Sequence, residues 1–192
     1  MTITRRSGIA EVAAAVAAAL AQHGVHAVLT GGACAMLYSD GRYQSHDLDF
    51  ILSDGSTRRA VDEAMASVGF VREGDRYVNP HTEFFVEFPR GPLAIGDDLD
   101  VRPVRLNLSG GYTLALSATD ACRDRLAAFY HWSDRQSLQA AIDIARRQPV
   151  NLTAVRRWSK REGALDKFDE FRAALGAQQP SRPRQRNRRG GP

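Results

Sequence analysis

Two carboxylates stand two residues apart inside an apolar segment, HDLDFIL at residues 46–52. If this segment is a strand, alternation places Asp47 and Asp49 on one face and Leu48 and Phe50 on the other. Like charges at this spacing repel one another and resist burial, and a cation between them relieves the repulsion. Oxygen ligands that converge from one face suit Mg²⁺, and a pair of such ions supports phosphoryl transfer. The alternative is an acidic pair that ends an edge strand in solvent.

A pair of glycines, Gly31 and Gly32, follows the short apolar run HAVLT at residues 26–30 and precedes a predicted helix, ACAMLYS. Glycine lets backbone amides approach a ligand without obstruction by a Cβ atom. The amino end of a helix adds unpaired N–H groups and the positive end of the helix dipole. The arrangement predicts a phosphate cradle, although the same dipeptide also fits an ordinary turn. The sequence contains neither GxxxxGK[ST] nor GxGxxG, so it supports neither a P-loop nor a dinucleotide-binding fold.

A third carboxylate comes from the predicted strand TEFFVEFP, residues 82–89. Alternation places Glu83, Phe85 and Glu87 on one face of that strand. Glu87 lies between bulky apolar residues, so we expect it to point inward toward the aspartate pair from a neighbouring strand. Glu83 lies nearer the strand start and is expected in solvent. The alternative for Glu87 is an exposed edge position.

The wider pattern predicts an α/β half followed by a helical half. Helical periodicity marks residues 8–23 and 57–69, and residues 70–79 have the pattern of a hairpin. Glycines and prolines punctuate residues 90–117, which we interpret as strand and loop. Four further helices are predicted from Thr119 onward. We therefore expect three successive units, namely an α/β (α+β) domain over residues 1–117, a helical domain over 118–176 and a disordered basic tail over 177–192.

The positive charge of the chain is concentrated at its carboxyl end. The 192 residues carry a formal net charge of +4, but the last segment, AQQPSRPRQRNRRGGP, holds five arginines and no acid, and the remainder is near −1. Such a segment lacks apolar anchors and can contact RNA or another polyanion electrostatically. A solvated tail without a specific partner is the alternative.

No apolar run reaches the roughly 18–20 residues that span a bilayer, so we expect a cytoplasmic protein without membrane contact. Cys34 and Cys122 lie in predicted helices and are expected to be buried free thiols, because no Cys or His spacing fits a zinc site. Trp132 and Trp158 fit the core faces of helices better than platforms for base stacking. Arginine- and alanine-rich usage with few lysines suggests a GC-rich bacterial genome.

The series strand, Gly-Gly, helix, loop and Ser-x-Asp-Leu-Asp-Phe, which runs from Gly31 to Phe50, resembles the nucleotidyltransferase superfamily related to DNA polymerase beta. The fourteen residues between Gly32 and Asp47 are most similar to the toxin-type and uncharacterised bacterial branch, the AbiEii/MenT-like group. The resemblance covers residues 25–90 firmly and 119–147 loosely. It implies a nucleotidyltransferase-like mixed sheet flanked by helices, followed by a helical C-terminal bundle.

In that superfamily the glycines and a nearby hydroxyl hold the nucleotide phosphates, and the paired acids hold divalent metal. The resemblance implies phosphate contacts from Gly31, Gly32 and Ser45. It implies that Mg²⁺ or Mn²⁺ is held by three catalytic carboxylates, namely Asp47, Asp49 and Glu87. Many relatives use Asp at the third position or lack it.

The toxin-like branch also tends to carry a basic residue on a helix, followed about nine residues later by an Asp that opens the next helix. Arg125 and Asp134 stand at that spacing here, which implies that they contact the nucleotide. The family's usual basic residue is Lys. An arginine still binds phosphate, but it does not transfer protons.

The resemblance implies an enzyme that uses an NTP as substrate and transfers its nucleoside monophosphate to RNA, a protein or a small molecule. A toxin-like role with an antitoxin-like protein partner belongs to the same implication. Two alternatives stay open. One is a catalytically inactive protein of this fold that binds a nucleotide or a partner. The other is an RNA-binding protein that uses its arginine tail, with the globular part as scaffold.

Overall fold

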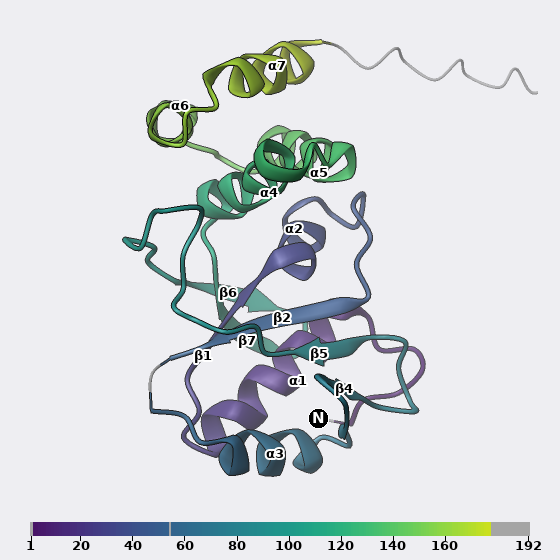
Figure 1. Ribbon diagram of the computed structural model, residues 1–192. Coiled ribbons are helices and arrows are strands. Elements are labelled where there is room, and N and C mark those ends of the chain that lie inside the picture. Colours follow the sequence, from purple (N-terminus) through teal and green to yellow (C-terminus); the bar gives the residue numbers. More distant parts are fainter. Residues whose placement is uncertain (1, 54, 178–192) are drawn as a thin grey trace, which may run out of the picture.

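The computed structural model describes residues 2–53 and 55–177 of the chain (Figure 1). Within them the helices are α1 (Ile9–Gln22), α2 (Gly31–Tyr38), α3 (Arg58–Ser67), α4 (Ala118–Trp132), α5 (Arg135–Arg147), α6 (Leu152–Arg161) and α7 (Leu165–Gly176). The strands are β1 (Ala27–Thr30), β2 (Asp47–Leu52), β3 (Val71–Glu73), β4 (Arg76–Val78), β5 (Phe85–Glu87), β6 (Val104–Leu108) and β7 (Gly111–Ala115). The predicted disordered tail falls, from residue 178 on, outside the described residues.

The seven strands of the described part form one mixed sheet in the order β3-β4-β5-β2-β1-β7-β6. β2 pairs antiparallel with β1 and parallel with β5, and β1 pairs parallel with β7. Both outer pairs, β3 with β4 and β6 with β7, are antiparallel hairpins. The predicted α/β (α+β) class, with a mixed sheet flanked by helices and a helical C-terminal part, is confirmed.

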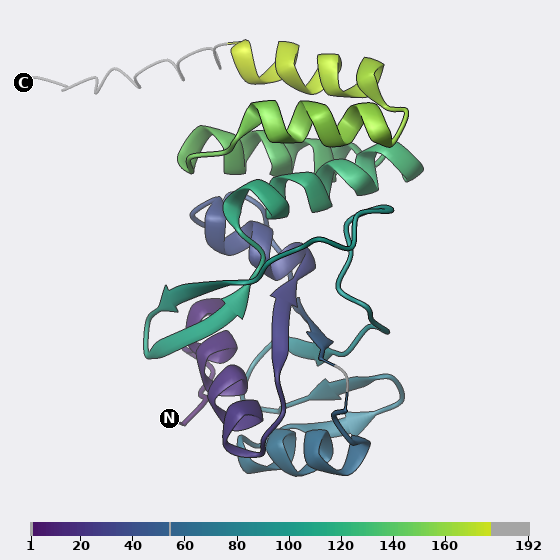
Figure 2. The same cartoon turned by 90° about the vertical axis from the view of Figure 1, so that its left-hand side faces the viewer.

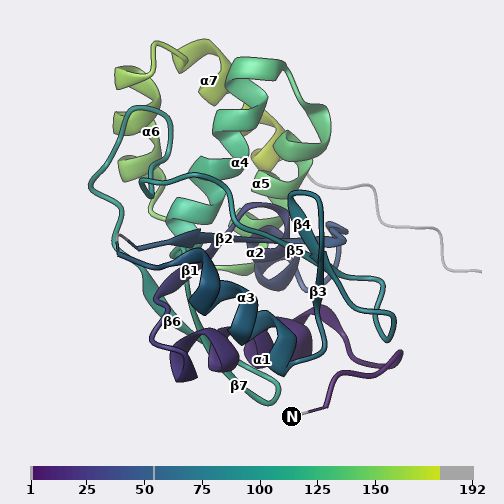
Figure 3. The same ribbon diagram turned by 60° about the horizontal axis from the view of Figure 1, so that its bottom comes forward.

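The helices cover the two faces of the sheet unequally. α1 packs against β7 and α3, and Figure 3 shows α1 and α3 side by side on one face. α2 packs against β2 on the opposite face and also contacts α4 and α5. α6 and α7 form the outermost layer, farthest from the sheet (Figures 1 and 2). α2 therefore joins the sheet to the helical layers, and the predicted boundary at residue 117 stays a prediction.

Alternation along β2 separates its apolar side chains from its acids. Leu48 and Phe50 are fully buried, whereas Asp47 and Asp49 are half-buried on the other face. Each fully buried large apolar side chain contributes roughly 1.5–3 kcal/mol relative to exposure. This burial fixes the register of β2, because a slip of one residue would exchange the two sets of side chains.

The predicted strand at residues 82–89 is too long at both ends, since β5 spans only Phe85–Glu87. The preceding residues form a turn in which the Thr82 amide donates to the Asn79 carbonyl at 3.1 Å. The Asn79 side chain also accepts from the His81 amide at 2.9 Å. This turn uses the backbone groups that a longer strand would have needed, and it leaves Glu83 outside β5 and exposed.

The two cysteines are buried free thiols, as predicted. Of the tryptophans, Trp158 is buried, but the prediction for Trp132 is wrong, because its side chain is 77% exposed. Trp132 is the last residue of α4, and the left-handed Ser133 that follows (φ 54°) turns the chain toward α5. No helix in the described ranges combines the length and apolar character needed to cross a bilayer.

Candidate active site

The pairing of β2 with both its neighbours brings the acidic residues together. Asp49 is the partner of Thr30 on β1 and of Glu87 on β5, and Asp47 is the partner of Phe85. Paired residues on adjacent strands point to the same face, with the strands roughly 5 Å apart. Asp47, Asp49 and Glu87 therefore share one face of the sheet, where all three are half-buried.

The three carboxylates repel one another in this arrangement. Burial, together with the negative charges of Asp47 and Glu87, raises the pKa of Asp49 to about 7, and the charge of Arg125 only partly opposes this. In the described part of the chain, no arginine or lysine lies within 4.0 Å of these carboxylates. The cluster thus holds negative charge that no side-chain cation pairs.

The glycine pair lies directly against this cluster, where β1 passes into α2. Gly31 has φ +64°, a left-handed conformation that side chains other than glycine's rarely adopt, and a Cβ atom on it would lie 3.1 Å from Cγ of Asp49. A Cβ atom on Gly32 would lie 3.0 Å from Cβ of Ser45 and 3.4 Å from the Tyr43 ring. Both positions therefore need glycine for β2 and the loop before it to pack this closely.

Ser45 is buried and its hydroxyl is directed to the acidic cluster. Oγ donates to Oδ1 of Asp47 and lies 3.4 Å from the Asp47 carbonyl oxygen. The resemblance implied a phosphate contact for this hydroxyl. In the structure it donates to the first carboxylate, next to Gly32, and its contact with phosphate stays a prediction.

Arg125, on α4, acts on Asp49 through its charge and is hydrogen-bonded to its neighbour in the sequence. Its Nε and Nη2 atoms donate to Oδ2 of Asp124 at 3.0 and 2.7 Å, and both side chains are largely buried. Burial alone would lower the pKa of Arg125, but the charge and hydrogen bonds of Asp124, and contact with Tyr43, raise it. The guanidinium is therefore a permanent charge near Asp49, paired with Asp124.

Asp134 caps the amino end of α5. One carboxylate oxygen accepts from the Gln136 amide at 2.9 Å, and the other accepts from the Ser137 hydroxyl at 2.6 Å. The Ser137 hydrogen bond, with smaller effects from the Gln136 amide and the charge of Arg125, lowers the pKa of Asp134. Asp134 thus has a structural role as a cap, and its contact with a nucleotide stays a prediction.

Asp124 is not among the site residues that the sequence predicts. The signal that could have found it is an acid beside a basic residue already expected to face phosphate, because a partly buried arginine needs a partner.

The carboxylates of this site can be compared with the ligands that a divalent cation requires. Within residues 2–53 and 55–177, no three Cys, His, Asp or Glu side chains are placed to ligate one metal ion together. Mg²⁺, however, is usually held by one or two carboxylates together with substrate phosphates and water, not by a cage made only of protein ligands. Asp47 and Asp49, with unpaired charge and hard oxygen donors beside a glycine turn, fit that mode of binding.

No protein-family model matches the chain. No curated protein sequence matches it either. Its fold is similar to the crystal structure of an antigenic nucleotidyltransferase-like protein from Paracoccidioides brasiliensis, with a TM-score of 0.57 and 17% identity over 92% of this chain and 96% of that chain. The solution structure of the antibiotic-resistance factor ANT(2'')-Ia is more distant, with a TM-score of 0.45 and 12% identity over 84% and 87% of the two chains. At 17% identity the first likeness shows a nucleotidyltransferase-like fold, as the sequence predicted, and the chemistry must be argued from the site.

Proposed function

We propose that this chain is a metal-dependent nucleotidyltransferase that moves a nucleoside monophosphate from an NTP to an acceptor. The observation that carries the proposal is the convergence of Asp47, Asp49 and Glu87 on one sheet face, directly beside Gly31. Unpaired acids at a glycine turn destabilise a fold, and such perturbed groups concentrate where chemistry occurs.

The triphosphate would bind where the glycine turn opens α2. Backbone N–H groups of Gly31 and Gly32 can approach phosphate oxygens closely, and the amino end of α2 adds a favourable dipole. Arg125 would add a permanent positive charge from α4, with the geometry that suits phosphate. These groups would orient the nucleotide so that its α-phosphorus faces the acceptor.

Asp47 and Asp49 would hold Mg²⁺ or Mn²⁺, which when bound supplies charge neutralisation and lowers the pKa of the acceptor hydroxyl. The acceptor oxygen forms a bond to the α-phosphorus in line with the bond to the β-phosphate oxygen. That second bond breaks, and pyrophosphate leaves with its electron pair. A carboxylate oxygen of Glu87 takes the proton from the acceptor, and positioning by the chain's own residues supplies much of the rate.

Asp124 would act as a positioning residue in this scheme. Among the charged side chains that affect the pKa of Asp49, Arg125 is the one that lowers it. If Arg125 had no other partner, it could pair with Asp49 and compete with a metal ion for that carboxylate. Its hydrogen bonds to Asp124 would keep the guanidinium from pairing with the three carboxylates. We therefore assign Asp124 the role of keeping Asp47 and Asp49 free for a cation.

A toxin-type branch with an antitoxin-like partner rests on the loop length before Asp47 and on the spacing of Arg125 and Asp134. The labelling experiment described below identifies the acceptor class, whether RNA, protein or a small molecule. The pairing of Glu87 with Asp49 supports an enzyme over an inactive binding protein, because an inactive relative has no need of the third acid.

The test is to incubate the protein with each NTP labelled at the α-phosphate, Mg²⁺ or Mn²⁺, and in turn total RNA, cell protein and a small-molecule extract. We expect one acceptor class to become labelled, with release of pyrophosphate. Asp49→Asn should abolish labelling, and Asp166→Asn, at an exposed position on α7, should preserve it. Binding of an NTP without any labelled product would instead support the inactive binding protein.

A further inference from the structure

Charge divides the chain into unlike parts. Residues 1–117 contain ten arginines, no lysine and fourteen acids, whereas residues 118–177 contain eleven basic residues and eight acids. The last fifteen residues add five arginines and no acid. The acidic excess thus belongs to the part of the chain that holds the carboxylate cluster, and the basic excess to the helical part.

The basic excess has a defined location on the outermost layer. A hollow of about 510 Å³ lies between α6 and α7, and its lining includes Arg156, Arg157, Lys160 and Arg172 but only one acid, Asp169. We call the hollow lined by these four cations the α6/α7 basic groove. All four are exposed, and within the described part of the chain none forms an ion pair with a carboxylate.

The fold holds this groove open to solvent. On α6, Val155 and Trp158 are fully buried, and the Trp158 indole N–H donates to the Ile95 carbonyl at 3.2 Å. On α7, Phe168 is buried beneath the groove. Since these apolar residues fix the inner faces of both helices, the cations are presented outward.

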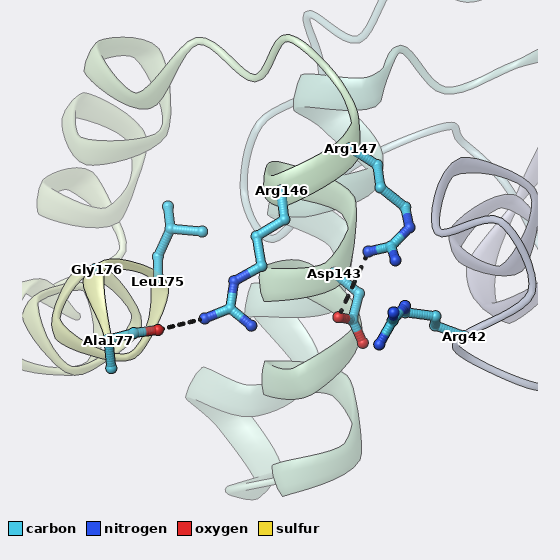
Figure 4. Close-up of a pocket in the computed structure, with 7 residues that line it drawn as sticks. All are labelled: Arg42, Asp143, Arg146, Arg147, Leu175, Gly176 and Ala177. Carbon is cyan, nitrogen blue, oxygen red and sulfur yellow. Dashed lines mark hydrogen bonds and ion pairs between the residues drawn. The ribbon is translucent and has the colours of Figure 1, made fainter. Parts of the chain in front are cut away.

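A second basic hollow shows what arginines that serve the fold look like. It has a volume of about 450 Å³ and includes Arg42, Arg146 and Arg147 (Figure 4). Arg147 faces the carboxylates of Asp40 and Asp143 at 3.4 and 3.9 Å. Arg146 donates to the carbonyls of residues 174 and 177 at the end of α7, at 3.0 and 2.9 Å. The α6/α7 cations make no comparable contacts in the described part, so their charge is available to a ligand.

We propose that the α6/α7 basic groove binds the phosphodiester backbone of a nucleic acid. Arginine presents a planar fork that matches phosphate oxygens, and three of the four cations are arginines. Nucleic-acid interfaces are polar and strongly positive, whereas the centres of protein interfaces lose charged residues and gain aromatic ones. The large exposed apolar side chains of the described surface all lie outside this groove, namely Val71, Leu99, Val104, Tyr112, Leu114 and Trp132.

Two other occupants fit less well. The carboxyl-terminal segment of the same chain carries five arginines and no acid, so it would be repelled by the groove. An acidic protein would find charge complementarity, but the two apolar residues of the lining, Leu152 and Phe168, are half-buried and buried and offer it no exposed apolar anchor.

The proposed contact is independent of the transfer reaction. α6 and α7 lie beyond α4 and α5 from the sheet, so the groove would anchor a backbone and not place a reacting group (Figure 2). Contacts to phosphate alone fix position without reading sequence. Each phosphate contact adds about 0.7 to 0.9 to the slope of log Kd plotted against log salt concentration. Four contacts therefore predict a slope of about 3.

The test measures binding of a fluorescein-labelled RNA oligonucleotide to the full chain by anisotropy, between about 50 and 200 mM KCl. The groove variant carries Arg156→Gln, Arg157→Gln, Lys160→Gln and Arg172→Gln. The control variant removes the same charge from exposed positions of the other half, namely Arg5→Gln, Arg6→Gln, Arg59→Gln and Arg102→Gln. A third variant changes the five arginines after residue 177 to Gln.

We expect the groove variant to lower the salt slope by about 3, while the control variant leaves it nearly unchanged. The third variant should bind RNA more weakly, but its salt slope should still include the contribution of about 3 from the groove. A DNA oligonucleotide of the same sequence shows whether the ribose 2′-hydroxyl contributes. Melting curves confirm that each variant is folded, and Asp49→Asn should bind the RNA like the unmodified chain.

Two results would overturn the proposal. One is a groove variant that binds RNA with the affinity and salt slope of the unmodified chain. The other is a polyglutamate peptide that binds the groove as tightly as RNA, which would assign the surface to an acidic protein.

Discussion

Two acidic clusters in this molecule differ in the cations that the fold supplies to them. Asp98, in the loop before β6, pairs with Arg123 on α4 at 2.5 Å and with Arg161 on α6 at 2.8 Å. Burial alone would raise the pKa of Asp98, but the hydrogen bonds and charges of these arginines lower it. Asp49 lies beside two other carboxylates, and its pKa is raised.

The difference separates an acid that holds the structure together from acids left available for a ligand. Asp98 fastens its loop to two helices, and Arg123 adds a second ion pair to Asp120 at 2.8 Å. A fold that can pair one half-buried acid with two arginines could pair another. The unpaired state of Asp49 therefore points to a cation that arrives from outside the chain.

The largest expected difference between the clusters is in activity. Asp49→Asn should lower nucleotidyl transfer by about 100- to 1,000-fold or more, because it removes a carboxylate that would hold the divalent cation at the reacting phosphate. Asp98→Asn should change kcat by no more than a few-fold in the folded protein. Initial rates with the labelled acceptor test both variants, and equal losses would erase the distinction between the clusters.

The same two substitutions should have opposite effects on stability. Asp98→Asn removes one of the two carboxylates that pair with the buried Arg123 and should lower the free energy of unfolding by about 1–3 kcal/mol. Asp49→Asn removes repulsion and should raise it by about 1–2 kcal/mol, after allowance for partial exposure. Urea unfolding in EDTA measures both changes, and a loss of stability in Asp49→Asn would contradict this interpretation.

The glycine turn sharpens the comparison further. Gly31→Ala would strain a left-handed residue and also force its Cβ atom against the Asp49 carboxylate. Gly24→Ala is the matched control, since Gly24 has φ +69° but no atom of the described residues within 4 Å of where a Cβ atom would stand. In each variant, backbone strain should lower the free energy of unfolding by about 1–2 kcal/mol. Only Gly31→Ala should in addition lose nucleotide binding, as measured by calorimetry, and equal binding by both variants would argue against the cradle.

The stability difference for Asp49 should depend on pH. The folded-state pKa is about 7 against an ordinary value of 3.8, so the folded protein binds the proton more tightly than the unfolded chain. The destabilisation is absent below about pH 4, grows as pH rises, and is complete above about pH 7. Unfolding of the unmodified chain and of Asp49→Asn across this range should diverge, and parallel curves would contradict the prediction.

The smallest expected effect belongs to Asp124. Asp124→Asn should raise KM for the NTP by about fivefold to tenfold with a lesser change in kcat, because Arg125 is no longer held in place. It should also reduce the thermal stabilisation that Mn²⁺ alone gives the protein. Asp124→Glu should restore part of both, whereas a purely structural role would move melting temperature without changing the response to Mn²⁺.

Much of the candidate site could be predicted because its signals are local. The spacing of Asp47 and Asp49 and the glycine pair can be recognised within one strand–helix–strand unit. Glu87 required a further assumption, that its strand pairs with β2, and the structure bears this assumption out. The strand around Glu87 was predicted too long, because the turn made by the Asn79 side chain competes with strand pairing.

Contacts between distant segments could not be predicted. The pairing of Asp98 with Arg123 joins residues 25 apart, across a loop with no periodic pattern. Trp132 was expected in the core, because helical periodicity does not show where the left-handed turn after α4 exposes the last side chain.

The central claim is that Asp47 and Asp49 bind a divalent cation together with a triphosphate held at Gly31 and Gly32. The most direct measurement is anomalous diffraction from crystals grown with Mn²⁺ and a non-hydrolysable NTP analogue. We predict a manganese peak in contact with both aspartate carboxylates, with triphosphate oxygens against the glycine amides. An ordered nucleotide bound elsewhere, or manganese that avoids both aspartates, would contradict the claim.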